Sequence, residues 1–198
     1  MPDSRIVVLA SGTGSLLQAI IDSQLRECLV AVGSDVDDAP ALLRAEAVGI
    51  PTFVVPMSAD RAAWDNALQG RLREWMPDLI VTAGFMRVLG NRTVTEFSSR
   101  IINSHPALLP AFPGAHAVHD AMAYGAKVTG CTVHLVDAGV DTGPIIAQQP
   151  VTIESDDTEE SLHERIKEIE RVLLVDVLTR AVHEGISVRG RSVTFGER

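Results

Sequence analysis

Cysteine is scarce in this sequence of 198 residues, which contains two, Cys28 and Cys131. They are far apart, and neither belongs to a CxxC pattern. The sequence therefore offers neither a disulfide framework nor a set of zinc ligands. We expect two buried thiols in a reducing compartment and no bound metal.

Basic charge and long apolar segments are also scarce. Lys and Arg number 17 against 26 Asp and Glu, which gives a formal net charge of −9. Nucleic acid is not expected as the main partner, because binding its backbone needs a basic face, whereas one local pocket is enough for a small phosphorylated substrate. No apolar run approaches the roughly 20 residues of a membrane helix, and the N-terminal residues do not read as a signal peptide. These absences predict a soluble, cytoplasmic protein without a membrane partner.

Short apolar runs alternate with helical patterns over the first half of the chain. Strands are expected at residues 5–10, 29–34, 52–55, 79–83 and 101–103, and helices at 16–23, 39–48 and 60–75. This alternation is typical of an α/β fold with a mainly parallel, Rossmann-like sheet and helices on both faces. The second half is richer in strands, with a hairpin expected from 128–136 and 145–153, a long helix at 159–183 and a small hairpin at 188–195. With 46% hydrophobic residues, residues 1–198 are expected to form one domain.

Small residues fill the loop between the first strand and the first helix, which reads Ser11-Gly12-Thr13-Gly14-Ser15. Glycines let a backbone approach a ligand closely, and the amides at the start of a helix favour an anion. The loop lacks the third glycine of a dinucleotide-binding fingerprint and the Gly-Lys-Ser/Thr of a Walker A loop. It therefore indicates either a site for one phosphate or only a tight turn.

An amide and an imidazole are combined in the segment Asn103-Ser104-His105-Pro106. Side chains two apart in an extended chain point to the same side, and Pro106 favours an extended conformation for the residue before it. Asn103 and His105 are thus expected to face one space at the end of a central strand, where open α/β sheets bind ligands. Together they could stabilise a carbonyl oxygen that becomes negative during attack. The alternative is a turn in which both side chains satisfy backbone groups.

Two aspartates lie in the loop Asp137-Ala138-Gly139-Val140-Asp141-Thr142-Gly143-Pro144. Asp, Gly and Pro are ordinary turn residues, and an EF-hand calcium loop would need more acidic ligands and flanking helices. If this loop meets His105, the carboxylate of Asp141 would raise the pKa of the imidazole and could relay a proton through water. The loop is therefore either a turn or a catalytic element.

In combination, these segments resemble the folate-dependent formyltransferases. The matching segments occur in the family's order and cover residues 5 to about 175; they are 11–15, 83–89 (Ala-Gly-Phe-Met-Arg-Val-Leu), 103–110, 112–116 (Phe-Pro-Gly-Ala-His) and 137–144. The resemblance implies that Asn103, His105 and Asp141 are catalytic and that 10-formyltetrahydrofolate is the formyl donor. An acceptor amine would attack the formyl carbon directly, His105 and Asn103 would stabilise the oxyanion, and Asp141 would keep His105 protonated and assist proton transfer, without a metal.

The resemblance also implies two binding regions. The acceptor's phosphate and ribose are expected at Gly12, Thr13, Gly14, Ser15, Leu16, Arg61, Lys167 and Glu170. The folate is expected at Phe85, Met86, Arg87, Val88, Leu89, Asn103, Val136, Asp137, Ala138, Gly139, Val140 and Asp141. Residues from 1 to about 100 would then form a phosphate-binding half, and residues from about 101 to 198 a catalytic and folate-binding half.

Two positions depart from the family's usual pattern. Leu16 stands where the family often has an asparagine, which removes one polar contact to the acceptor phosphate and leaves more to backbone amides. The family often has two histidines in the order Gly-x-His-x-His-x, whereas His116 and His119 lie three residues apart here. The resemblance therefore gives His116 and His119 no defined role.

The expected acceptor depends on what accompanies the catalytic core. Family members that formylate methionyl-tRNA add a C-terminal domain, and those that hydrolyse formyltetrahydrofolate add an N-terminal regulatory domain; neither is expected here. The match at Arg61 and the long helix with Glu170 favour glycinamide ribonucleotide, an intermediate of purine biosynthesis. One alternative is a hydrolase or a formyltransferase for another amine, and a second is a folate- or nucleotide-binding domain without chemistry. The sequence leaves a homodimer open.

Overall fold

The structure is a computed structural model that describes residues 4–196. Its strands are β1 (Ile6–Leu9), β2 (Leu29–Ser34), β3 (Thr52–Val54), β4 (Leu79–Thr82), β5 (Ile101–His105), β6 (Val128–Leu135), β7 (Ile145–Thr152), β8 (Ile186–Arg189) and β9 (Ser192–Phe195). Its helices are α1 (Ser15–Ile21), α2 (Pro40–Glu46), α3 (Arg61–Trp75), α4 (Asn91–Glu96), α5 (Ala117–Tyr124) and α6 (Glu159–Glu184), with a 3-10 helix at Gln24–Cys28.

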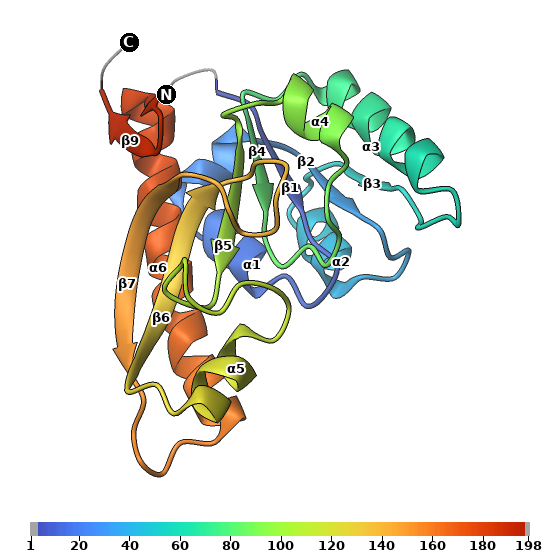
Figure 1. The fold of residues 1–198 in the computed structure, drawn as a ribbon. Coiled ribbons are helices and arrows are strands. Elements are labelled where there is room, and N and C mark those ends of the chain that lie inside the picture. Colours follow the sequence, from blue (N-terminus) through green and yellow to red (C-terminus); the bar gives the residue numbers. More distant parts are fainter. Residues whose placement is uncertain (1–3, 197–198) are drawn as a thin grey trace. The chain divides into compact units, whose positions relative to one another are not determined.

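The main sheet has seven strands in the order β3-β2-β1-β4-β5-β6-β7, flanked by helices (Figure 1). Strand β1 pairs in parallel with β2 and β4, and β2 pairs in parallel with β3. Strands β6 and β7 form the predicted antiparallel hairpin, and β8 and β9 form the small terminal one. The predicted α/β fold with a mainly parallel sheet is therefore confirmed.

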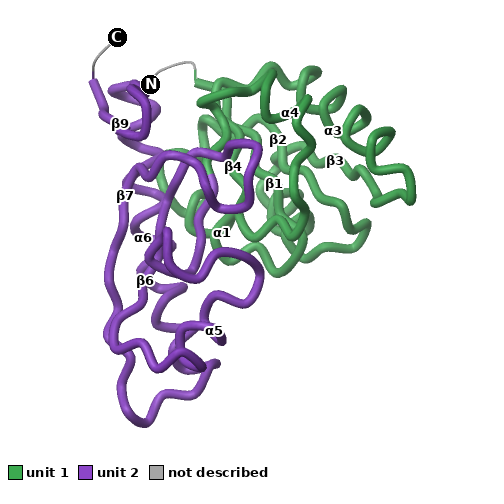
Figure 2. The backbone as a smooth tube through the Cα atoms, in the orientation of Figure 1, with its two compact units in different colours: residues 1–102 green, residues 103–198 purple. Residues whose placement is uncertain are grey.

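The chain divides into two compact units, with the boundary between Ile102 and Asn103 (Figure 2). This boundary falls inside β5, so one strand contributes residues to both units. The catalytic residues expected at positions 103, 105 and 141 all belong to unit 2. The assignment of phosphate binding to one half of the chain and catalysis to the other stays a prediction.

The first unit is built on strands that are buried from end to end. All four side chains of β1 are inaccessible to solvent, which is expected for a parallel strand covered on both faces. The chain leaves β1 through a turn at Gly14, whose φ of 72° suits glycine. A Cβ at Gly14 would lie 2.9 Å from the Cα of Ala41, so this turn also needs a residue without a side chain.

The second unit has its own apolar core, centred on Val118, Cys131, Val151, Leu162 and Ile166. Helix α6 begins with a capping box, in which the hydroxyls of Thr158 and Ser161 each accept a hydrogen bond from the other's backbone N–H, and it ends before Gly185 as predicted. Among the described residues, no helix is both long enough and apolar enough to cross a membrane.

Candidate active site

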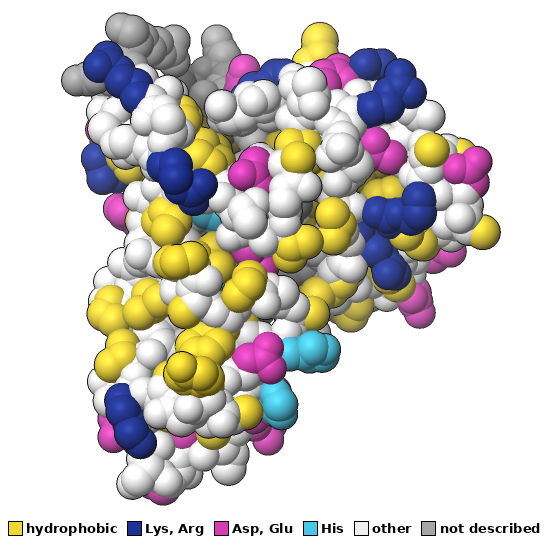
Figure 3. Space-filling model, in the orientation of Figure 1, with side chains coloured by type: hydrophobic (Ala, Val, Ile, Leu, Met, Phe, Trp, Pro, Cys, Tyr) yellow, Lys and Arg dark blue, Asp and Glu magenta, His cyan; other side chains and the backbone are white. Residues whose placement is uncertain are grey.

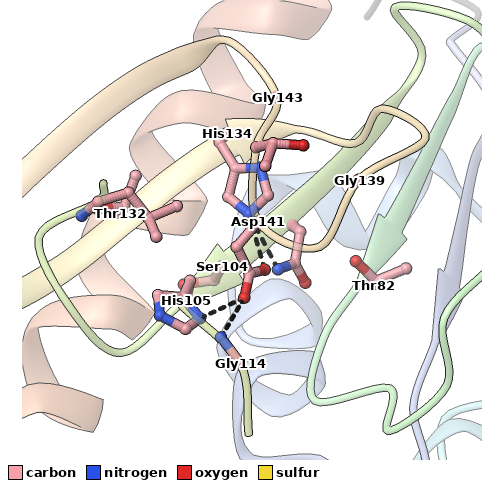
Figure 4. Close-up of polar contacts among 12 residues, drawn as sticks. Thr82, Ser104, His105, Gly114, Thr132, His134, Gly139, Asp141 and Gly143 are labelled. Carbon is pink, nitrogen blue, oxygen red and sulfur yellow. Dashed lines mark hydrogen bonds and ion pairs between the residues drawn. The ribbon is translucent and has the colours of Figure 1, made fainter. Parts of the chain in front are cut away.

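Strand β5 delivers three polar side chains in a row, and they alternate in direction. Ser104 is buried and donates a hydrogen bond from its hydroxyl to Oε1 of Glu170, at 2.7 Å. Asn103 and His105 lie on the other side of the strand, as the two-residue period of an extended chain predicts. Nδ1 of His105 lies beside the carboxylate of Asp141, and Asn103 contacts His134, whose ring lies beside the same carboxylate (Figure 4).

The imidazole of His105 lies between two oxygen acceptors. Its Nε2 is 2.8 Å from the carbonyl oxygen of Phe112, and its Nδ1 is 3.3 Å from Oδ2 of Asp141. A carbonyl oxygen only accepts, so Nε2 carries a hydrogen. Nδ1 is therefore the nitrogen that faces the carboxylate.

Burial lowers the pKa of His105 below the ordinary imidazole value, because charge is disfavoured away from water. The carboxylate of Asp141 and the carbonyl of Phe112 oppose this effect. The predicted effect of Asp141 on His105 thus has the expected direction. Burial has the larger effect, so the net pKa of His105 is lowered.

Asp141 is held by its backbone as well as by its side-chain partners. Its φ of 54° is unusual for a residue with a side chain, and Oδ2 accepts a hydrogen bond of 2.8 Å from the backbone N–H of Gly114. Burial opposes ionisation, but the hydrogen bond from Gly114 and the nearby His105 act in the opposite direction, and the pKa of Asp141 lies below its usual value. Asp141 is therefore a fixed negative charge beside His105, and the Phe112–His116 segment serves to hold it.

His134, near the end of β6, was missed by the sequence analysis. It is 2% exposed, its Nε2 lies 3.1 Å from Nδ2 of Asn103, and its Nδ1 lies 2.9 Å from the carbonyl oxygen of Leu135. A lone histidine in an apolar strand gives no signal in a sequence, because its neighbour Asn103 is 31 residues away. Figure 4 shows its ring above Asp141, which completes a cluster of four side chains.

Glu170, expected at the acceptor's ribose, is 5% exposed in the middle of α6. Burial raises its pKa, and the hydrogen bond from Ser104 acts in the opposite direction. Lys167, one turn earlier, forms an ion pair of 2.7 Å with Glu164. Glu170 thus contacts β5 through Ser104, and this contact was not predicted from the sequence.

In unit 1, the small-residue loop 11–15 forms hydrogen bonds with the loops that follow β2 and β4. Ser11 donates to Oδ1 of Asp35 at 2.5 Å and accepts the backbone N–H of Met86 at 2.9 Å. Asp35, whose side chain is fully buried, also pairs with Nε of Arg87 at 2.6 Å. Leu16, expected among the phosphate contacts, is 8% exposed, so its side chain belongs to the core.

The segment 85–89 presents apolar side chains to solvent. Met86 is 72% exposed and Val88 is 56% exposed, whereas Phe85 stacks on Trp64 with ring centroids 6.3 Å apart. Arg61 lies against this segment: its guanidinium donates to the carbonyl oxygen of Val88 at 2.6 Å and covers the ring of Trp64 at 4.6 Å. The structure therefore brings Arg61 to the predicted folate segment.

The loop 137–143 in unit 2 is folded around Asp137. Its Oδ1 accepts the backbone N–H of Gly139 at 3.0 Å and the hydroxyl of Thr142 at 2.6 Å, and Val140 stays 52% exposed.

Hydrophobic side chains reach the surface on the face shown in Figure 3, as do histidines. His116 and His119 are both exposed, and Nδ1 of His119 lies 3.2 Å from Oδ1 of Asp120.

A model of the family described as formyl transferase matches residues 4–178. The chain is also 52% identical over 200 residues to the phosphoribosylglycinamide formyltransferase of Mycobacterium tuberculosis, with 98% of this chain and 93% of that protein covered. The chain belongs to the formyl transferase family. The segments that suggested this resemblance, 11–15 through 137–144, all lie within the matched residues.

Solved structures agree with this membership. The glycinamide ribonucleotide transformylase 1 of Symbiobacterium toebii superposes with a TM-score of 0.93 at 40% identity, over 98% of this chain and 94% of that one. A formyltetrahydrofolate deformylase of Pseudomonas syringae superposes with a TM-score of 0.91 at 24% identity, and 66% of its chain is covered. The second likeness shows the fold alone.

Two features of this formyl transferase do not bear on the predicted site. Among residues 4–196, no group of three or more His, Cys, Asp and Glu side chains is arranged to hold a metal ion. A surface depression of about 420 Å³ in unit 1 is lined by Gln69, Arg73, Asn91, Arg92, Thr95 and Glu96. None of these residues was predicted to bind substrate.

Proposed function

We propose that this formyl transferase moves the formyl group of 10-formyltetrahydrofolate to the amine of glycinamide ribonucleotide, in purine biosynthesis. The observation that carries the proposal is the cluster of Asn103, His105 and Asp141, in a chain that matches a phosphoribosylglycinamide formyltransferase over nearly its whole length. The cluster supplies donors for an oxyanion and a fixed carboxylate. It contains no serine or cysteine nucleophile, so direct transfer fits better than a covalent acyl-enzyme.

In the proposed reaction, the acceptor's amine nitrogen forms a bond to the formyl carbon, and the carbonyl electron pair moves onto oxygen. Asn103 donates a hydrogen bond to this oxygen, and Nδ1 of His105 donates a second one when the ring is in its charged form, since Nε2 already donates to Phe112. The attacking nitrogen then loses a proton, and the leaving N10 of the folate gains one as the C–N10 bond breaks. Asp141 accepts the proton from the attacking nitrogen and passes it to N10, directly or through water, while the electron pair on oxygen re-forms the carbonyl. Asp141 also holds His105 in the orientation and charge state that the step needs.

The acceptor's phosphate is proposed to bind the backbone amides at Gly12–Ser15, with Leu16 contributing its amide and not its buried side chain. Gly12 and Thr13 are exposed, as a ligand site requires. Its ribose is proposed to bind Glu170 and Lys167. Because Ser104 donates to Oε1 of Glu170, Oε2 is the oxygen that we assign to a ribose hydroxyl.

The folate is proposed to bind the exposed apolar segment 85–89, and the loop from Val136 to Asp141 as the family resemblance implies. In unit 1, Met86 and Val88 offer exposed apolar surface that a flat pterin ring could cover. Arg87 is paired with Asp35, so its guanidinium is already neutralised. Arg61 is then the cation of this segment, and we propose that it binds a carboxylate of the folate tail in preference to the acceptor's phosphate.

The test is a transfer assay with the purified protein, 10-formyltetrahydrofolate and free glycinamide ribonucleotide. We expect formylglycinamide ribonucleotide and tetrahydrofolate in equal amounts, and no release of formate when the acceptor is omitted. Formate release without acceptor would identify a hydrolase. Binding of both substrates without turnover would identify a binding domain. A cytoplasmic location and a homodimer remain predictions of the sequence.

A further inference from the structure

His134 lies at the centre of the catalytic cluster, although no sequence motif marks it. It belongs to β6, and its side chain is 2% exposed. The groups around its ring are the carboxamide of Asn103, the carboxylate of Asp141, the imidazole of His105 and the carbonyl of Leu135. Such a ring has two nitrogens, and which of them carries hydrogen decides what its neighbours can do.

The hydrogen on His134 is placed by the backbone. Nδ1 lies 2.9 Å from the carbonyl oxygen of Leu135, and that oxygen can only accept a hydrogen bond. Nδ1 must therefore carry a hydrogen. In the neutral ring, Nε2 then has a lone pair and acts as an acceptor.

The lone pair on Nε2 faces the carboxamide of Asn103. The distance from Nε2 to Nδ2 of Asn103 is 3.1 Å, within hydrogen-bond range, whereas Oδ1 of Asp141 is 3.6 Å away, which is too long for a hydrogen bond. The amide nitrogen of Asn103 thus donates to His134. A charged His134 would reverse this contact, because an N–H at Nε2 would favour the amide oxygen of Asn103 in that place.

We propose that His134 is a positioning residue: its neutral Nδ1–H form orients the carboxamide of Asn103 so that the amide nitrogen, and not the oxygen, points into the catalytic cluster. An amide nitrogen carries two hydrogens, so one can bond to His134 and the other can serve the formyl oxygen. The inference rests on the proposed transfer reaction for its kinetic consequence, but the orientation of Asn103 does not depend on it.

The kinetic test compares two substitutions of His134. His134→Leu removes the acceptor, whereas His134→Gln keeps an oxygen near the place of Nε2 and cannot take up a proton. We expect His134→Leu to lower kcat by about 10- to 100-fold, within the range for one lost oxyanion donor, with the KM of both substrates changed less than threefold. His134→Gln should recover most of that loss. Equal losses in the two variants would overturn the proposal.

A double variant separates positioning from general damage to the fold. If His134 acts through Asn103, His134→Leu should cost little more in a background of Asn103→Ala, so the two effects are not additive. Fully additive losses would show that His134 acts by another route.

A measurement on the unaltered protein needs neither turnover nor a folded variant. We expect ¹⁵N NMR of the His134 ring near neutral pH to show a protonated Nδ1 and an unprotonated Nε2. A protonated Nε2 would overturn the proposal, even if transfer to glycinamide ribonucleotide is observed. The expected ring form in a protein without transfer activity would leave the positioning intact and reject the proposed function.

Discussion

At the scale of single residues, the ring of His105 is held between two acceptors. Phe112 and Asp141 can each take one of its N–H groups, so contacts favour the charged form, while burial favours the neutral one. The two effects oppose each other, and burial is the larger. A donor whose charge can change near neutral pH suits a reaction in which an oxyanion forms and then disappears.

Replacing His105 should remove this donor while leaving the binding segments in place. We expect His105→Ala to lower kcat by roughly 100-fold or more, the usual cost of one oxyanion donor. Folate affinity, measured by fluorescence titration, should change far less. Near-normal turnover in this variant would exclude His105 from the reaction.

The carboxylate of Asp141 should control the charge of His105. In Asp141→Asn, the main influence that raises the pKa of His105 is lost, while burial still lowers it. The imidazole should therefore titrate at a lower pH than in the unaltered protein, and kcat should fall severely. NMR titration of His105 in both proteins measures the shift, and circular dichroism controls for folding.

The contrary result would show that the charge of His105 does not depend on Asp141. An unchanged or higher pKa of His105 in Asp141→Asn would mean that the carboxylate does not influence the ring. The formyl transferase assignment would stand in that case, because it rests on the match over residues 4–178.

Arg61 offers a choice between the two substrates. The resemblance assigns it to the acceptor's phosphate, whereas its contact with Val88 favours the folate. We expect Arg61→Ala to raise the KM for the folate about tenfold or more, on the scale of a lost charge-assisted contact, and to leave that for glycinamide ribonucleotide nearly unchanged. Arg71, on the same helix and paired with Glu74, is the control position. A selective rise for glycinamide ribonucleotide would restore the phosphate assignment.

Part of this site could be predicted from the sequence, and part could not. The shared side of Asn103 and His105 follows from strand alternation, and Asp141 from the family's pattern. His134, the N–H of Gly114 and the carbonyl of Phe112 could not be predicted. No period or motif links residues 7 to 31 positions apart, and backbone groups are the same at every position.

At the scale of elements, three loops that follow parallel strands of unit 1 are joined through Asp35. Its carboxylate binds Ser11, which follows β1, and Arg87, which follows β4. Ser11 also accepts the backbone N–H of Met86. The proposed phosphate loop and the proposed folate segment are therefore parts of one hydrogen-bond network in unit 1.

Breaking this network should affect both substrates. Asp35→Ala leaves the guanidinium of Arg87 and the hydroxyl of Ser11 without their carboxylate, which should lower the free energy of unfolding by about 1–3 kcal/mol. It should also raise both KM values. Asp35→Asn, which keeps an acceptor for Ser11, should be milder. Asp37→Ala changes an exposed aspartate two residues away and is the matched control.

Most helices and strands were predicted from the sequence, and two helices were not. The helix 60–75 and the hairpin of 128–136 and 145–153 were expected within a residue or two of α3, β6 and β7. Helices α4 and α5 were missed, whereas α1 and α2, with seven residues each, were predicted, so length alone does not decide. Helix α4 is held by tertiary contacts, because Asp65 accepts hydrogen bonds from the hydroxyl of Thr93 and from the backbone N–H of Gly90, its N-cap residue.

At the scale of the whole molecule, the boundary between the two units lies within a single strand. Residues 101 and 102 of β5 belong to unit 1, and residues 103–105 belong to unit 2. Because the strand is continuous, breaking its backbone hydrogen bonds in one unit disturbs those of the residues next to them in the other unit. We therefore expect the two units to unfold together.

The two cysteines can test this cooperativity, since each unit contains one. Cys28 is 3% exposed and Cys131 is fully buried, and burial raises the pKa of both thiols, that of Cys131 to about 12. Because the thiolate is the reactive form, neither should react with a thiol reagent at pH 7.5 in the native protein. At saturating reagent and moderate urea, labelling follows the opening rate, so both cysteines should be labelled at the same rate. Cys28→Ser and Cys131→Ser assign the two signals. A Cys28 that reacts much faster than Cys131, with a weaker dependence on urea, would show that unit 1 opens while unit 2 stays folded.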